Sequence, residues 1–69
     1  MARIPVNSSN IASVGYDAAT SSLQIEFLNG KVYEYYEVPE SEFDGLVNAG
    51  SPGGYFHANI KNIYSYAEI

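Results

Sequence analysis

Residues 23–36 read Leu-Gln-Ile-Glu-Phe-Leu-Asn-Gly-Lys-Val-Tyr-Glu-Tyr-Tyr. Two runs of alternating apolar and polar residues surround an Asn-Gly pair, a pattern typical of a β-hairpin. The apolar positions run from Leu23 to Phe27 on the first strand, and Tyr33 and Tyr35 match them on the second. We therefore expect this hairpin to be the centre of the fold.

Two loop lengths give two different registers for this hairpin. A two-residue turn at Asn29-Gly30 would set Ile25 opposite Glu34 on the buried face. A three-residue loop, with Gly30 at positive φ as a bulge, sets Ile25 opposite Tyr33 instead. Only the second register keeps a charged side chain out of the core, so we predict the three-residue loop. Its other pairs are Phe27 with Lys31, Leu23 with Tyr35, and Gln24 with Glu34.

The composition limits both the fold and the function. A chain of 69 residues is one small domain and buries only about 60% of its unfolded surface. It contains no cysteine, so neither a disulfide nor a thiolate metal site supports the fold. The net charge of −5 disfavours unassisted binding to phosphate backbones or anionic membranes. No apolar run has the length of a membrane span or a signal-peptide core, so we expect a cytoplasmic protein without membrane contact.

The segments before the hairpin predict a short lead-in and one more strand. Residues 1–9 contain a proline and a Ser-Ser pair and are expected to be the lead-in, with a single domain over residues 10–69. Ala12, Val14 and Tyr16 share a face at period two and indicate a strand. With the hairpin, this strand completes a three-stranded antiparallel meander.

The segments after the hairpin predict two short helices on one face of the sheet. The first spans residues 40–49, has an apolar stripe at Phe43, Leu46 and Val47, and is expected to end at a Gly50 cap. After a turn at residues 51–54, the second helix spans residues 55–61. Phe56 and Ile60 form its apolar face, which Ile63 is expected to continue. Residues 64–67 alternate again and predict either a C-terminal strand or an extended tail against the sheet, so the expected class is α+β.

No catalytic or metal-binding pattern stands out. His57 is the only histidine, and no serine or cysteine motif accompanies it, so a surface or capping role is expected. The acidic residues between Glu34 and Asp44 lack the spacing of a calcium loop and suit a solvated face and a helix N-terminus. Gly53-Gly54 lacks the lysine of a phosphate-binding loop and is expected to be a turn. We therefore expect no enzyme activity, no cofactor and no metal.

The seven tyrosines are the unusual feature of the composition. Tyr16, Tyr33 and Tyr35 are expected on the core face, and Tyr36 is expected to point the other way. Aromatic rings on a sheet can stack on bases when a basic groove accompanies them, but the three basic residues are scattered along the sequence. Exposed tyrosine is also favoured at protein interfaces. The candidate binding residues are Lys31, Tyr33, Tyr35, Tyr36 and Lys61.

The chain resembles the KTSC domain, a small family named for the C-terminus of some lysyl-tRNA synthetases and also found as stand-alone bacterial or phage proteins. The resemblance covers nearly the whole chain. It is carried by Tyr33-Glu34-Tyr35, Val38-Pro39 and Gly54-Tyr55-Phe56, in that order, together with Val14-Gly15-Tyr16-Asp17. The resemblance implies no catalytic residues. It suggests RNA binding, although the family's Asn and following basic residue after Tyr-Phe are replaced here by His57 and Ala58, and of the basic residues downstream only Lys61 remains.

The sequence thus favours a non-catalytic interaction module. The expected partner is a protein or a second copy of the chain, because the acidic balance, Tyr36 and the open sheet edges suit such contacts. The alternative is an RNA- or tRNA-binding accessory domain that uses the Tyr-x-Tyr strand.

Overall fold

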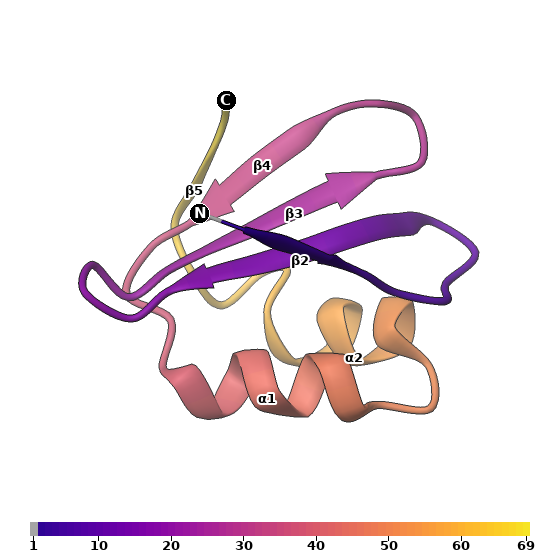
Figure 1. Cartoon of the computed structure of the whole chain (residues 1–69). Helices are drawn as coiled ribbons and strands as arrows, with labels where there is room; N and C mark the ends of the chain where they lie inside the picture. The colour runs from indigo at the N-terminus through magenta and orange to yellow at the C-terminus, as the bar shows by residue number, and fades with distance from the viewer. Residues whose placement is uncertain (1) are drawn as a thin grey trace.

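The computed structural model describes residues 2–69. Within this range the elements are β1 (Arg3–Pro5), β2 (Ile11–Asp17), β3 (Ser22–Phe27), β4 (Val32–Tyr35), α1 (Glu40–Asn48), α2 (Pro52–Asn59) and β5 (Tyr66–Glu68). The strands form one antiparallel sheet in the order β1-β2-β3-β4-β5, which is also their order along the chain. Both helices lie beneath the same face of this sheet (Figure 1), which gives a two-layer α+β architecture.

The central hairpin has the predicted register. Leu23 pairs with Tyr35, and Ile25 pairs with Tyr33. Gly30 has φ +91°, as the three-residue loop requires. The loop is closed by two backbone hydrogen bonds of 2.9 Å, one donated by the Phe27 N–H to the Lys31 carbonyl and one by the Gly30 N–H to the Phe27 carbonyl. The prediction of a bulged loop is confirmed.

The sheet has five strands within residues 2–69, so the expected three-stranded meander is incomplete. Residues of the expected lead-in form β1, in which Ile4 pairs with Val14. At the other edge, β5 pairs with β4 and sets Tyr66 opposite Tyr35, which confirms the strand alternative for the C-terminal segment. All three residues of β1 are exposed. Backbone pairing therefore holds β1 in place without the apolar alternation that would have revealed it.

One face assignment in β2 is corrected by a β-bulge. The register of this strand shifts between Ile11 and Ser13. Val14 and Tyr16 lie on the core face as expected, but Ala12 does not join them. The extra residue turns Ile11 inward, where it lies opposite Phe27 and is only 1% exposed.

Helix α1 begins at Glu40 as expected. Its stripe faces the sheet: Leu46 is buried, and the Phe43 ring stacks on the Tyr16 ring at 5.5 Å. The expected Gly50 cap is wrong, because the C-cap is Ala49 in an extended conformation and Gly50 does not have positive φ. The helix therefore ends at a residue with extended backbone dihedral angles and not at a residue in the left-handed region.

Helix α2 begins three residues earlier than predicted. The Ser51 side chain caps it by accepting a hydrogen bond from the Gly54 N–H at 3.3 Å, and Pro52 occupies the first turn. The expected turn at residues 51–54 is thus the start of the helix. Because the helix ends at Asn59, helical spacing no longer applies to Ile63, which is 63% exposed and not on the buried face.

The core lies between the sheet and the two helices. Its buried side chains come from β2, β3, β4, both helices and the segments that follow β4 and α2: Ile11, Val14, Leu23, Ile25, Tyr35, Val38, Leu46, Phe56 and Ile60. At its rim the Tyr16 hydroxyl donates a 2.6 Å hydrogen bond to the Val38 carbonyl. This bond ties β2 to the connection that leads into α1.

Candidate functional site

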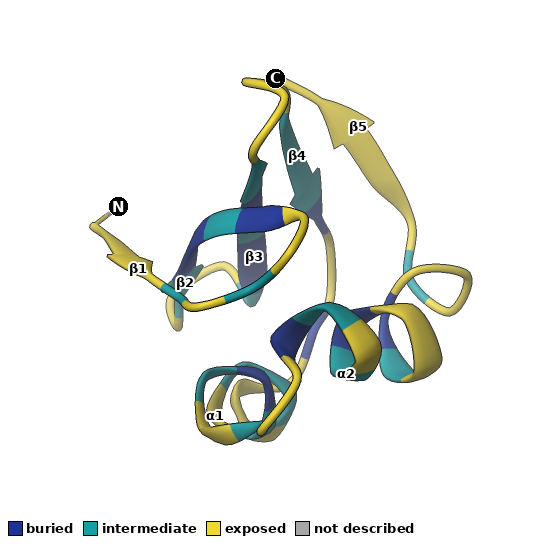
Figure 2. Ribbon diagram, turned by 90° about the vertical axis from the view of Figure 1, so that its right-hand side faces the viewer, coloured by how far each residue is buried: buried dark blue, intermediate teal, exposed yellow. Residues whose placement is uncertain are grey.

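A pocket of about 400 Å³ opens between the sheet and α2. Its walls come from the segment before β2, the end of β3, the β3–β4 loop, β4, α2, the segment after α2, and β5. Figure 2 shows β4, β5 and α2 around this side of the molecule. We call this feature the aromatic pocket, after the five rings that line it: Phe27, Tyr33, Tyr35, Phe56 and Tyr66.

The rings form one connected cluster. Phe56 meets Phe27 and Tyr35 edge to face, with centroids 5.6 and 5.5 Å apart. Tyr66 stacks on Tyr33 at 5.6 Å and is tilted against Tyr35 at 5.2 Å. Tyr35 and Phe56 are buried, whereas Tyr66 is 56% exposed. Phe27 and Tyr33 are half-buried, so the cluster has two buried inner rings and is most exposed at Tyr66.

Burial also changes the acidity of the innermost tyrosine. Desolvation, followed by the neighbouring Tyr66 and Tyr33 phenols, raises the pKa of Tyr35 to about 12. The Tyr35 hydroxyl therefore stays protonated at neutral pH. It is a neutral group in the wall of the pocket.

The polar part of the lining carries positive charge. Lys31, His57 and Lys61 line the pocket together with the amide side chains of Asn10, Asn29 and Asn62. Among residues 2–69, no aspartate or glutamate belongs to the lining. Two of the three basic residues of an acidic protein are thus brought to one site.

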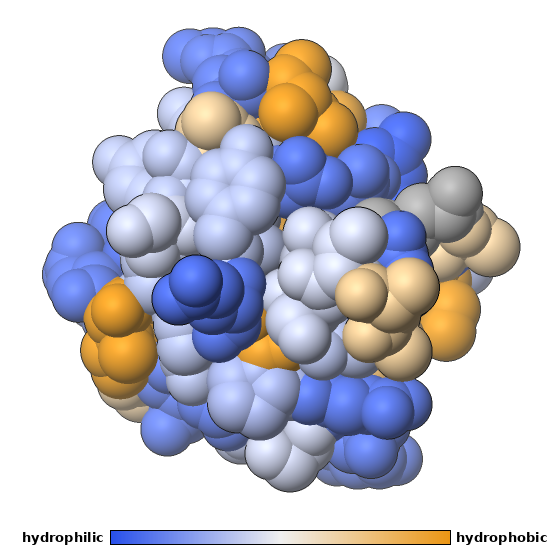
Figure 3. Space-filling view, turned by 90° about the vertical axis from the view of Figure 1, so that its left-hand side faces the viewer, coloured by the Kyte–Doolittle hydropathy of each residue, from blue (hydrophilic) through white to orange (hydrophobic). Residues whose placement is uncertain are grey.

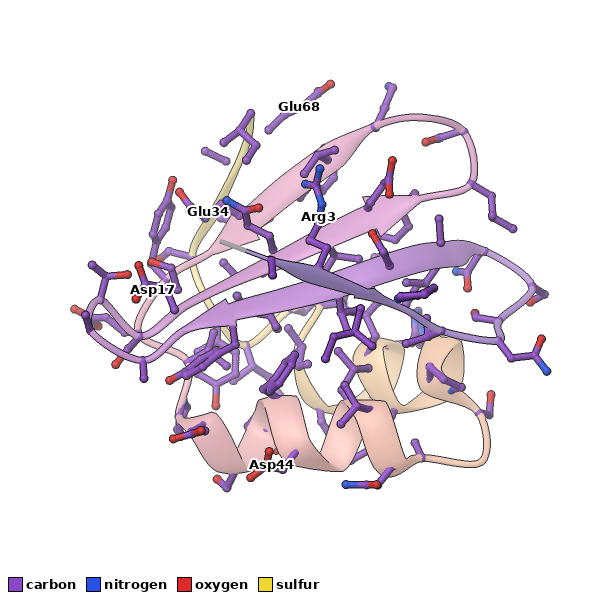
Figure 4. The ribbon with its side chains drawn as sticks, in the orientation of Figure 1. Arg3, Asp17, Glu34, Asp44 and Glu68 are labelled. Carbon is purple, nitrogen blue, oxygen red and sulfur yellow. The ribbon has the colours of Figure 1, made fainter. Side chains whose placement is uncertain are left out.

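The carboxylates lie elsewhere. Figure 4 shows Glu34 beside Arg3 on the side of the sheet away from the helices, Asp17 at the β2–β3 loop and Asp44 on the far side of α1. Glu68 follows Tyr66 on β5 and lies opposite Tyr33 in the register of the sheet, but it does not line the pocket. The sequence alone had suggested that the cations are scattered, and that interpretation is wrong for Lys31 and Lys61.

A second hollow of about 490 Å³ continues from the aromatic pocket past the start of α2, and the two share Asn10, Gly53 and His57. Gly53 allows the segment before β2 to pack closely on the helix. A Cβ atom at this position would lie 2.6 Å from the Asn10 Oδ1 and 3.2 Å from the Ser8 Oγ. A side chain there would push these two segments apart.

Four of the five candidate binding residues meet in the aromatic pocket: Lys31, Tyr33, Tyr35 and Lys61. Tyr36 follows the end of β4, is exposed and does not line the pocket. The sequence-based list of candidate binding residues did not include Tyr66 or Phe56, and Phe56 was assigned only to the apolar face of the second helix. The predicted register could have indicated Tyr66. Any strand that pairs with β4 places some of its side chains on the same face of the sheet as Tyr33 and Tyr35.

His57 is exposed, as expected, but it lines both hollows. In the described part of the chain, no group of three His, Cys, Asp or Glu side chains is arranged to hold a metal ion. Neither of the helices found in residues 2–69 is long and apolar enough to cross a membrane.

Comparison with known proteins identifies the family. The family model of the KTSC domain matches residues 7–64. A lysine–tRNA ligase of Trichormus variabilis is 43% identical over 54 residues, which cover 78% of this chain and 10% of the ligase. This chain thus spans about a tenth of the length of that enzyme. A protein of Tsukamurella paurometabola is 44% identical over 57 residues, covering 83% of this chain and 85% of that protein.

The structural comparison gives the same answer. The crystal structure of a KTSC domain protein from Yersinia pestis superimposes with a TM-score of 0.93 at 38% sequence identity. The match covers 99% of this chain and 96% of that one, so the five-stranded sheet and both helices are common to the two. With its sequence and its fold in agreement, the chain belongs to the KTSC domain family.

Proposed function

We propose that this domain is a non-catalytic RNA-binding module that takes single-stranded RNA into the aromatic pocket. The observation that carries the proposal is the lining itself, in which five aromatic rings lie together with Lys31 and Lys61. Proteins that bind single-stranded nucleic acid combine these two features, because rings stack on bases and cations neutralise phosphates.

The net charge of −5 does not oppose this proposal as strongly as it did from the sequence alone. Interactions between exposed charges are screened beyond about 10 Å at 0.1 M salt. A phosphate in the pocket would therefore respond mainly to the lysines that line it. Carboxylates on the outer side of the sheet or beyond α1 would contribute little.

The relatives support the choice of RNA among polyanions. Lysine–tRNA ligases of Trichormus variabilis and Nostoc carry a similar segment in about a tenth of their length. A module attached to an enzyme named for tRNA would meet that RNA at high effective concentration. This argument rests on association, whereas the lining of the pocket supplies the mechanism.

The surface is less suited to binding a protein partner or a second copy of the chain. The edge strands β1 and β5 are only three residues long, which limits pairing with another chain. On the face in Figure 3, hydrophobic side chains form separate small patches with hydrophilic side chains between them. A stable protein interface usually has an apolar core that is continuous.

The test is an amide NMR titration of the labelled protein with unfractionated tRNA, supported by binding measurements over a series of salt concentrations. We expect shifts in residues of the aromatic pocket. With two phosphates neutralised, the affinity should fall with a slope of about −1.4 in log–log form, since single strands give roughly −0.7 per contact. In Lys31→Gln/Lys61→Gln the slope should approach zero.

Arg3→Gln is the matched control, because Arg3 is the third basic residue and lies on the outer side of the sheet (Figure 4). Its slope should remain that of the unmodified protein. Absence of any shift at low salt, where electrostatic binding is strongest, would overturn the proposal. Loss of binding in Arg3→Gln together with full binding in the double lysine variant would do the same.

A further inference from the structure

We infer that the aromatic pocket recognises one unpaired nucleotide, whose base stacks on Tyr66 and whose phosphate lies near Lys31 and Lys61. This inference rests on the proposed function and specifies its ligand. The nucleotide can come from a single-stranded RNA or be a free nucleoside monophosphate, since both present the same ring and the same charge.

The size of the site limits the ligand to a single unit. A volume of about 400 Å³ lies in the lower part of the range of roughly 300–1,000 Å³ in which proteins enclose one small molecule. The walls supplied by β5, α2 and the β3–β4 loop bound this space. One nucleotide fits such a volume, and neighbouring nucleotides of an RNA would lie outside it.

Tyr66 is the ring that is available for stacking. Tyr35 and Phe56 are buried and meet each other edge to face, so their surfaces are already used within the protein. Tyr66 stacks on Tyr33 and remains 56% exposed. A base placed on its open surface would extend the existing stack from β4 through β5 to the ligand.

The polar side chains suit a ligand with acceptor atoms. The Asn29 Oδ1 already accepts a hydrogen bond from the Lys31 N–H at 3.0 Å, and the Asn10 Oδ1 accepts one from the Ser8 hydroxyl at 3.0 Å. The amide NH₂ groups of these two residues are therefore left to donate. Donors beside two lysines match phosphate oxygens and base carbonyls.

A base within a duplex cannot use this site. Both of its faces are covered by neighbouring bases, and the stacking on Tyr66 requires one free face. Sequence-specific and single-strand RNA recognition uses unstacked bases in loops and at ends for the same reason. The inferred ligand is therefore an unpaired nucleotide.

The experiment measures competition against a labelled six-nucleotide unstructured RNA. Adenosine 5′-monophosphate should displace the RNA, and adenosine without the phosphate should do so at least several-fold less effectively. The same RNA annealed to its complement should bind poorly. Tyr66→Ala should weaken RNA binding by roughly 5- to 150-fold, which corresponds to the loss of one base–aromatic stack.

Two further variants separate stacking from folding. Tyr66→Phe keeps the ring and should bind like the unmodified protein even if Tyr66→Ala loosens β5. Tyr36→Ala removes an exposed ring outside the pocket and should leave binding unchanged. Full RNA binding in Tyr66→Ala would overturn the inference.

The outcomes also distinguish the inference from the proposed function. If the RNA binds through the lysines but the monophosphate neither competes nor shifts the amides of the pocket, the inference fails and the proposed function stands. If the monophosphate binds in a manner that requires Tyr66 while RNA does not bind, the proposed function fails and the pocket is a site for free nucleotides. If neither ligand binds, both fail.

Discussion

The two sides of the sheet differ in both polarity and charge. The side that faces the helices carries buried apolar residues such as Leu23 and Ile25 and ends in the aromatic pocket. On the outer side, the Arg3 Nη1 donates a hydrogen bond to the Gln24 Oε1, and the Gln24 Nε2 donates one to the Glu34 Oε2. Both hydrogen bonds are 3.3 Å long. The alternation of the hairpin thus places its apolar side chains on the inner side and the carboxylates of Glu26 and Glu34 on the outer side.

This difference shows why the net charge of a small domain is a poor guide to its binding sites. Glu26 and Glu34 occupy even positions of the hairpin and lie on the outer side because Ile25 and Tyr35 lie on the inner one. The same register keeps Glu26 and Glu34 out of the pocket, whereas Glu68, opposite Tyr33 on β5, lies on the inner face without lining the pocket. To predict a binding site, the charge must therefore be summed for each face of the sheet separately and not for the whole chain.

The largest expected effect compares neighbouring residues on opposite sides. Tyr35→Ser removes a ring that is 2% exposed and contacts Phe56 and Tyr66, and should lower the free energy of unfolding by about 3–5 kcal/mol. Glu34→Ser on the outer side should change it by less than about 0.5 kcal/mol. Urea denaturation measures both values, and equal costs would contradict the assignment of the two sides.

Alkaline pH should act on the inner side through the same tyrosine. The pKa of Tyr35 is raised to about 12 in the folded protein and is about 10 when the chain is unfolded. Ionisation then favours the unfolded state, so stability is retained below pH 10 and lost as the pH rises toward 12. The slope for this one proton is at most about 1.4 kcal/mol per pH unit.

Tyr35→Phe is the control for the pH dependence, because it keeps the ring and removes the proton. Its stability should fall less steeply between pH 10 and 12 than that of the unmodified protein, as measured by denaturation at several pH values. Parallel curves for the two proteins would exclude a raised pKa for Tyr35.

A smaller effect is expected in the loop that sets the register. Gly30→Ala should cost about 1–2 kcal/mol, because φ is +91° and a side chain is strained there even though nothing lies within 4 Å of the added Cβ. Gly50→Ala also meets open space but at ordinary φ, and should be neutral or stabilising by up to about 1 kcal/mol. Thermal denaturation measures both variants. The melting temperature of Gly30→Ala should fall, whereas that of Gly50→Ala should stay the same or rise.

The smallest effect concerns the polar contacts of the outer side. The Ser13 hydroxyl donates a 2.7 Å hydrogen bond to the Glu26 Oε1. A double-mutant cycle with Ser13→Ala and Glu26→Ala should give a coupling of about 1 kcal/mol. The exposed contact between Arg3 and Gln24, at 3.3 Å, should give a value near zero. A larger coupling for the exposed contact would reverse the ranking.

Local patterns were sufficient for the centre of the fold. The register of the hairpin followed from keeping Glu34 out of the core, and α1 followed from the spacing of Phe43, Leu46 and Val47. The edges were harder, because β1 is exposed throughout and its pairing depends on backbone groups that have no sequence pattern. The bulge in β2 was equally hidden, since Ala12 and Ile11 are both apolar and either could face the core.

The candidate site was only half predictable for a related reason. Lys31, Tyr33 and Tyr35 belong to one hairpin, so their proximity could be inferred from the register. Lys61 follows α2 and Tyr66 begins β5, so whether these residues lie at the pocket depends on where the second helix ends. The sequence pattern placed the helix at residues 55–61, whereas the Ser51 cap shifts it to Pro52–Asn59.

The sheet order has a consequence for folding kinetics. Strands β1, β2 and β3 each pair with a strand that follows after a short loop, so three of the four pairings should form rapidly. The pairing of β4 with β5 must wait for both helices, because they intervene in the chain. Strand β5, which carries Tyr66, is thus expected to pair last during folding and to separate first during local unfolding. Among the strands that line the pocket, the backbone amides of β5 should therefore exchange their hydrogens fastest.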